Sequence, residues 1–493
     1  MISFRHRGPI ALAAFVVSAG TATADVTPGQ VWDAISGQLE GMGYALKVDT
    51  ISKTDDSLVL GDVTYDMDLP DGGSIKIITR GMRFDADGQG GVNGDFSHLT
   101  MGLALANPKG EEVEAELALS TAGQEVVYSG TPEEIKSTFD WPLATLSLTA
   151  LRVDGKPVEA TGALTMHDLS GVYTYKTPAD GSGPTIDSNM KMSRLDIDGQ
   201  GTTTDDKPVN IKLTGAVLDI AATGTGQDLQ MMLGGLPKSG ASRVSYGAGN
   251  LDLAMDGEEG SMTLGAKTAS GFAESSVANG HLIYGTGGTG FEISAAGSMI
   301  PLTGTVFKMA TTESHLDLPM EASEDAQHFG LSFSLDGIEL ADQVWAMFDP
   351  QATLARDPAT LSLNVSGDAV LKQSLAEVFE NPEALQESPA DLRSLVIDGL
   401  VMRVFGAELT AAGNAMFNPP SPMPVGTIDV HAKNITSVLQ KLSALGLIDP
   451  SMGGMAQMML GMYATPGDGP DTWDSHVEMT AEGGVLVNGQ PMQ

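Results

Sequence analysis

The sequence predicts a mainly β protein with a few capping helices, built as one or two large curved antiparallel sheets of meandering hairpins. The first observation is a hydrophobic period of two, which is typical of strands with one buried and one wetted face. The second is a set of tight-turn signals. Two clear alternating runs are VTYDMDL, with Val63, Tyr65, Met67 and Leu69 on one face, and EVEAELAL, with Val113, Ala115, Leu117 and Leu119.

The turn signals share the pattern apolar, any residue, apolar, Asp, Gly. Asp-Gly and Asn-Gly supply the positive φ that tight hairpin turns require, so each step is expected to end a strand. Their irregular spacing favours a meandering sheet over a solenoid of fixed period. The steps are Asp154-Gly155, Asp198-Gly199, Asp256-Gly257, Asp336-Gly337 and Asp398-Gly399, with a variant at Asn488-Gly489.

Helix signals are few. Thr27-Pro28 followed by Gln30 has the form of a capping box and predicts one helix start, and Thr131-Pro132 followed by Glu134 predicts another. Two more helices are expected over residues 368–379 and 434–445. Asp449-Pro450 then predicts the start of a last helix, which pairs with the preceding one through Gly446 as a helical hairpin over residues 434–463.

The chain divides by composition into a leader and two β-rich regions, residues 25–330 and 331–493. Residues 133–155 and 342–367 resemble each other as a short helix ending in Phe-Asp and then a strand reading Ala-Thr-Leu-Ser-Leu. This similarity suggests two related halves, either as separate domains or within one continuous sheet.

Residues 1–24 have the features of a secretory signal peptide, with Arg5 and Arg7 before an apolar run and a small-residue end at Ala24, so cleavage is expected before Asp25. The expected location is therefore the periplasm. No later stretch has the roughly 20 apolar residues of a transmembrane helix. The chain has no Cys, which excludes thiolate chemistry, and its net charge of −37 disfavours nucleic acid as a partner.

The methionines of SMGGMAQMMLGM form the main candidate site. Met452, Met455, Met459 and Met462 follow helical spacing on one face, expected to lie against Ile435, Val438, Leu442 and Leu445 of the preceding helix. Three interpretations stay open: ordinary core, which such a stripe usually is, an adaptable apolar ligand surface, or a Cu(I) site of thioethers.

Other motifs are weak. Gly285, Gly287 and Gly290 in YGTGGTGF have dinucleotide-loop spacing, but a strand pattern follows them, so a hairpin loop is expected. The Asp-x-Asp-Gly-Gln-Gly segments that start at Asp85 and Asp196 are expected to be turns, with a weak Ca²⁺ site as the alternative. Catalytic signatures are missing, and the sequence predicts no catalytic residue, no metal site and no cofactor.

Several segments resemble a known family. DVTPGQVWDAISGQLEGMGYALKV, MHDLSGVY and HVEMTAEGGVLVNGQPM are similar to the exported bacterial proteins grouped as domain of unknown function 2125. More loosely, residues 407–492 resemble pieces of AsmA-like envelope proteins. That wider family implies long curved sheets with an apolar inner face that contacts lipid, although this chain lacks its membrane anchor.

Three functions follow as hypotheses. The first is a non-enzymatic periplasmic envelope protein that binds an apolar or amphipathic molecule, such as lipid, in a groove lined by aliphatic and Met side chains. The second is a structural scaffold of the cell envelope whose partner is another protein. The third is an exported hydrolase whose site is assembled only in three dimensions.

Overall fold

A computed structural model of the protein describes residues 25–41, 44–68, 74–96, 99–106, 112–177, 184–202, 208–225, 239–257, 260–300, 302–380, 388–418 and 423–492. The expected leader, residues 1–24, lies outside the described residues. The described part is mainly β, with helices α1 (Pro28–Gly41), α2 (Asp342–Phe348), α3 (Leu375–Glu380), α4 (Ile435–Ala444) and α5 (Pro450–Tyr463).

The strands up to the first long one are β1 (Ala45–Val48), β2 (Ile51–Lys53), β3 (Ser57–Leu60), β4 (Val63–Asp68), β5 (Ser74–Arg80), β6 (Arg83–Ala86), β7 (Val92–Asp95), β8 (Thr100–Ala106), β9 (Glu112–Ser120), β10 (Val126–Thr131) and β11 (Glu134–Val153). The middle strands are β12 (Lys156–Pro157), β13 (Ala160–Lys176), β14 (Thr185–Thr202), β15 (Pro208–Thr225), β16 (Gly240–Tyr246), β17 (Gly249–Gly257), β18 (Gly260–Thr268), β19 (Ser270–Ala278) and β20 (His281–Gly297). The last strands are β21 (Gly304–Pro319), β22 (Gln327–Leu340), β23 (Ala359–Leu371), β24 (Ala390–Val404), β25 (Ala407–Phe417), β26 (Pro424–Lys433), β27 (Thr465–Pro466), β28 (Thr472–Met479), β29 (Val485–Val487) and β30 (Gln490–Pro491).

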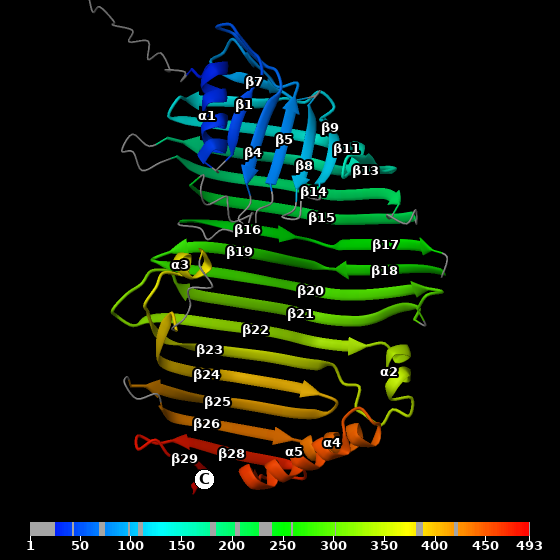
Figure 1. Ribbon diagram of the computed structural model, residues 1–493, viewed down its shortest axis with the longest axis vertical. Coiled ribbons are helices and arrows are strands. Elements are labelled where there is room, and N and C mark those ends of the chain that lie inside the picture. Colours follow the sequence, from blue (N-terminus) through cyan, green and yellow to red (C-terminus); the bar gives the residue numbers. More distant parts are fainter. Residues whose placement is uncertain are drawn as a thin grey trace, which may run out of the picture.

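All these strands belong to one antiparallel sheet, as the alternating sequence runs predict. The boundary between residues 330 and 331 lies inside β22, which pairs with β21 on one edge and with β23 on the other. The sheet is therefore continuous across that position. In Figure 1 the strands from β11 to β28 stack one after another along the long axis of the molecule.

The N-terminal end is a two-layer head. One edge of β11 pairs with β10 along its first part and with β9 along its last part, so the sheet divides there into two ribbons. The ribbons close over the main buried cluster of the described residues, with Val63 and Tyr65 from one, Leu58 and Phe84 from the other, and Val31 from α1. Because α1 fills the space between the ribbons, this end has a true core.

Beyond β11 the described residues form a single layer of long strands. Figure 1 places the helices at the ends and side edges of this layer, with α1 at the head, α2 and α3 beside the strand ends, and α4 and α5 at the C-terminal end. Antiparallel sheets commonly have one face packed and one face in water. In this protein the middle strands are in contact with solvent on both faces.

Side-chain alternation changes phase along one line that crosses this layer, which we call the pleat line. In β14 the less exposed side chains are at even-numbered positions as far as Met192. From Leu195 onwards they are at odd-numbered positions. Positive φ values mark the line at Asp168 (48°), Gly290 (65°) and Gly337 (67°), which the registers align across the sheet. The phase change keeps apolar side chains on one face along the whole length of each strand.

Several local predictions were wrong. Thr131-Pro132 does not start a helix, because the Thr131 hydroxyl accepts the Glu134 N–H in a tight turn between β10 and β11. The resemblance between residues 133–155 and 342–367 therefore pairs a continuous strand with a helix and strand. Residues 368–371 finish β23, so the expected helix shortens to α3, with Ser374 and Glu377 as its capping box.

The Asp-Gly steps have three different roles. Asp154-Gly155 and Asn488-Gly489 make the expected tight turns. Asp336-Gly337 and Asp398-Gly399 are irregularities inside β22 and β24, where the register shifts, and Asp198-Gly199 lies within regular β14. At Asp336-Gly337 the glycine supplies a positive φ of 67° within the strand irregularity, so an Asp-Gly step does not by itself end a strand.

Candidate ligand-binding surface

Apolar side chains on neighbouring strands stand directly opposite one another and form continuous rows across the sheet. Because directly paired residues share a face, each row lies on a single side of the layer. The central row is Leu146, Leu164, Ile197, Leu213, Leu251, Ala266, Ile293, Phe307 and Leu340. The C-terminal row is Tyr284, Leu316, Leu331, Val365, Ile397, Gly413, Ile428, Val477 and Val487.

These rows are partly open to solvent. Leu251 is 38% exposed and Ile293 44% in the central row, and Leu331 is 41% exposed in the C-terminal row. Single exposed apolar residues are normal on a protein surface, but contiguous rows of this length are typical of a binding surface. We call the side that carries both rows the apolar face.

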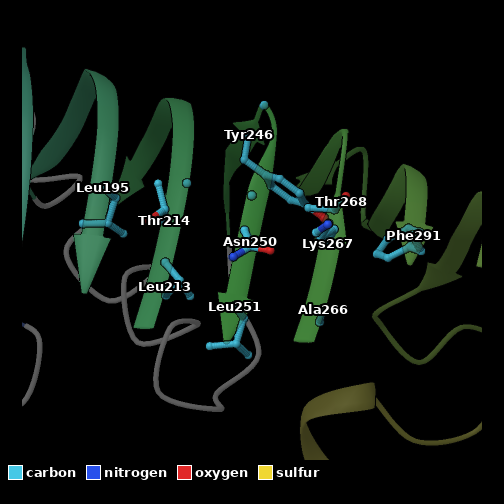
Figure 2. Close-up of a pocket in the computed structure, with 13 residues that line it drawn as sticks. Leu195, Leu213, Thr214, Tyr246, Asn250, Leu251, Ala266, Lys267, Thr268 and Phe291 are labelled. Carbon is cyan, nitrogen blue, oxygen red and sulfur yellow. The ribbon is translucent and has the colours of Figure 1, made fainter. Parts of the chain in front are cut away.

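A hollow of about 340 Å³ lies on the apolar face where the pleat line crosses the middle strands. Figure 2 shows its lining side chains on neighbouring strands, among them Leu195, Leu213, Leu251, Tyr246 and Phe291. The hollow is therefore mainly aliphatic and aromatic, which suits an apolar ligand.

Glycines let the two aromatic rings lie against the sheet beside the hollow. A Cβ on Gly271 would collide with the Tyr246 hydroxyl, and a Cβ on Gly288 would lie 2.6 Å from Cζ of Phe291. Gly287 is covered in the same way by Phe272. The segment YGTGGTGF is thus the interior of β20 and not the hairpin loop that the sequence predicts. Its glycines make room for aromatic rings, Phe272 from β19 over Gly287 and Phe291 of β20 itself over Gly288.

The opposite side of the sheet is polar. His281 and Asp317 bond across β20 and β21 at 2.6 Å, and two pairs in β26 and β28, His431 with Asp474 and His476 with Asp429, bond at the same distance. The last two pairs border a hollow of about 580 Å³. Their side chains are roughly half exposed, so each pair stabilises the sheet only slightly.

The hydrolase hypothesis calls for a cluster of His and carboxylate side chains around one pocket. In the part of the chain that the structure describes, no group of three or more His, Asp or Glu side chains is arranged to hold a metal ion. Asp87 of the first Asp-x-Asp-Gly segment accepts the N–H groups of Gln89 and Gly91, which is the hydrogen bonding of a simple turn. In the second segment, Asp198-Gly199 lies within β14.

The helical hairpin forms as predicted, with Gly446 at φ 72° between the helices and Asp449 capping α5 through the N–H of Ser451. The orientation of α5 is the reverse of the prediction. Met452, Met455, Met458, Met459 and Met462 are between 50% and 63% exposed, whereas Gly453 is buried against Ser443 of α4. The methionines are therefore not core and do not lie against α4.

Asp471 attaches the hairpin to the sheet. Its carboxylate accepts the N–H groups of Thr436 and Ser437 at the start of α4, the Ser437 hydroxyl at 2.6 Å and Nε1 of Trp473. Burial acts to raise the pKa of Asp471, but these hydrogen bonds outweigh it and lower the pKa to about 2. The carboxylate is thus charged at neutral pH and serves as a distant cap of α4.

Sequence reasoning singled out the methionines but missed the hollow and the rows. The alternating runs around Leu213 and Leu331 were visible as one-faced strands. What they could not show is which strands become neighbours, and that no second layer formed by the described residues covers the middle of the sheet. In the described residues, no helix has the length and apolar character needed to cross a membrane.

The comparisons with known proteins bear on the C-terminal part. A family model described as "Uncharacterized protein conserved in bacteria (DUF2125)" matches residues 290–492, which confirms the resemblance to domain of unknown function 2125. The search among curated proteins and the search among solved structures found no match. The matched residues run from the end of β20 to β30 and include most of the C-terminal row, α4 and α5. This part of the chain is therefore similar to the bacterial DUF2125 family.

Proposed function

We propose that the protein is a non-enzymatic periplasmic envelope protein whose apolar face binds an apolar or amphipathic molecule such as lipid. The observation that carries this proposal is the pair of continuous apolar rows left open to solvent. The periplasmic location rests on the leader-like residues 1–24.

The dimensions of the rows suit long hydrocarbon chains. Neighbouring strands lie about 4.8 Å apart, so the nine residues of the central row extend over roughly 38 Å. That length exceeds an extended acyl chain, and the side chains along it are almost all aliphatic or aromatic. Water next to such a surface is unfavourable, and a bound chain would remove it at about 25 cal/mol for each Å² of apolar area covered.

The test is native mass spectrometry, with solvent extraction, of the chain purified from the periplasm. Wild type should carry a lipid-sized adduct. Replacing both Leu251 and Ile293 by Glu places two carboxylates in the central row, so the adduct should fall to background. Leu143→Glu is the matched control, because Leu143 is as exposed as Ile293, at 44%, but stands opposite His167 on the polar face.

Two results would contradict the proposal: a bare mass for the wild-type chain, or equal loss of adduct in Leu143→Glu and in the double variant. A bare mass combined with crosslinks from the apolar face to another envelope protein would favour the scaffold function instead. Circular dichroism of each variant separates loss of binding from loss of the sheet.

A further inference from the structure

The outer surface of α5 is an unusual feature at the C-terminal end of the molecule. With 100° per residue, its five exposed methionines fall within an arc of about 120°, centred opposite the buried Gly453. We call this arc the methionine face; its members are Met452, Met455, Met458, Met459 and Met462. The helix therefore packs on α4 through its small residues and leaves its large apolar ones outside.

The methionine face is also free of charge. Asp, Glu, Lys and Arg make up 18% of the chain, so a 14-residue helix would be expected to hold about two or three, yet Pro450–Tyr463 contains none. The rest of the protein is strongly acidic, with a net charge of −37. A surface without charge in such a chain can approach a neutral partner without electrostatic cost, whereas an anionic partner would be repelled.

We infer that α5 docks on a lipid bilayer by inserting its methionine face among neutral, zwitterionic lipids. Amphipathic helices bind membranes in this way, with the axis in the interfacial plane and the apolar side among the acyl chains. Methionine side chains are unbranched and flexible, so they adapt to a fluid surface. Helix α5 contains no Trp or Arg, two of the side chains that usually anchor a protein partner.

The position of α5 agrees with this contact. Figure 1 shows the helix at the C-terminal end of the long axis, beside the last strands. Its final carbonyl, that of Tyr463, accepts the hydroxyl of Ser475, which shares its side of β28 with Val477 of the C-terminal row. Docking through α5 would thus bring one end of the apolar face to the bilayer surface.

The experiment is flotation of the full chain with phosphatidylcholine vesicles. Wild type should float with them. Replacing both Met455 and Met459 by Glu should weaken vesicle binding about tenfold or more, since two carboxylates then have to enter the acyl region. The matched control replaces Met347 and Met416 by Glu. These methionines are 64% and 51% exposed and lie elsewhere, so the charge change is the same and flotation should persist.

A second measurement reports depth directly. Because the chain has no cysteine, Met459→Cys creates one site for a polarity-sensitive fluorophore. Its emission should shift to the blue with phosphatidylcholine vesicles, whereas the same label at Met416→Cys should not respond. Because this variant carries no Glu substitution, the blue shift reports insertion of α5 even if the Glu variant fails to float because it does not fold.

Several outcomes would overturn the inference: no flotation of wild type, flotation only when anionic phosphatidylglycerol is added, or equal loss in the control variant. A dimer in light scattering that Met455→Glu with Met459→Glu abolishes would assign the methionine face to a second copy of the chain. Membrane docking by α5 and ligand binding by the apolar face can be tested independently of each other. The methionine variant should keep its lipid-sized adduct, and the Leu251 and Ile293 variant should still float.

Discussion

Asp471 shows how one carboxylate can fix the position of a helix that begins 36 residues earlier in the chain. The residue before α4, Asn434, has φ 57° and makes no side-chain cap. Asp471 provides the missing acceptor from the start of β28, at the cost of its own positive φ of 51°. The hairpin that carries the methionine face is therefore held to the sheet by a charged, non-local cap.

Asp471→Asn should lower the unfolding free energy of the hairpin region at neutral pH by about 1–2 kcal/mol, because the lowered pKa reflects stronger hydrogen bonding to the charged form. Asn tolerates positive φ, so the change removes charge with little strain. The stabilisation is present above pH 4 and is lost as the pH falls towards 2, where wild type and variant should converge.

Urea unfolding of both proteins at pH 7, 4 and 2 measures this difference. Asp468→Asn is the control, since Asp468 is exposed and lies three residues away, and it should match wild type throughout. A constant difference between wild type and Asp471→Asn at all three pH values would contradict the role of the charge.

Local caps could be predicted from sequence, and distant ones could not. Asp449-Pro450 precedes its helix directly, so its cap and helix start were predicted correctly. Thr131-Pro132 has an equally good local signal, yet its hydrogen bond closes a strand-to-strand turn, because long sheet pairing on both sides of β11 prevails over local helix preference. The cap from Asp471 has no sequence signal near α4.

At the scale of the element, α5 is oriented by a glycine. A Cβ on Gly453 would lie 2.5 Å from Oγ of Ser443, so any larger residue there has to displace the Ser443 hydroxyl or move α5 away from α4. The methionine spacing predicted a single helical face correctly. Its direction depended on which residue could approach α4 most closely, and hydrophobicity alone favours the opposite direction.

Gly453→Leu should separate α5 from α4 and cost about 1–3 kcal/mol, as overpacking usually does. The matched control is Gly454→Leu, because a Cβ at Gly454 has nothing within 4 Å. Hydrogen exchange of peptides covering residues 435–463 should be faster in the first variant and unchanged in the second. Equal exchange in the two variants would show that the close contact at Gly453 does not hold the hairpin.

At the scale of the whole molecule, the two-layer head and the single layer should differ in stability. Val63 and Phe84 in the head are fully buried, whereas Leu251 and Leu264 in β17 and β18 are more than a third exposed. Regions with few buried apolar contacts open locally at lower free energy. The mainly β class and the meandering antiparallel hairpins followed from sequence. The continuity of the sheet and this uneven burial did not, because they depend on which strands become neighbours and which gain a second layer.

Hydrogen exchange followed by mass spectrometry should therefore find β4 and β6 protected longest and β16 to β18 exchanging earlier. Adding the lipid that co-purifies should slow exchange in β16 to β18 selectively, since a ligand on the apolar face supplies part of the cover that the head already has. Uniform protection along the chain would contradict this division.

The pleat line limits which insertions and deletions the gene can accept. Because side chains alternate with a period of two, losing one residue from β14 between Ile186 and Met192 would exchange the two sides of the sheet over that stretch. Losing Ser193, at the line itself, would instead restore strict alternation and leave Leu195 and Ile197 on the same face as Met192. Natural relatives should therefore vary these strands in steps of two residues, at the pleat line or at their hairpin ends, and a set of aligned homologous genes would test this.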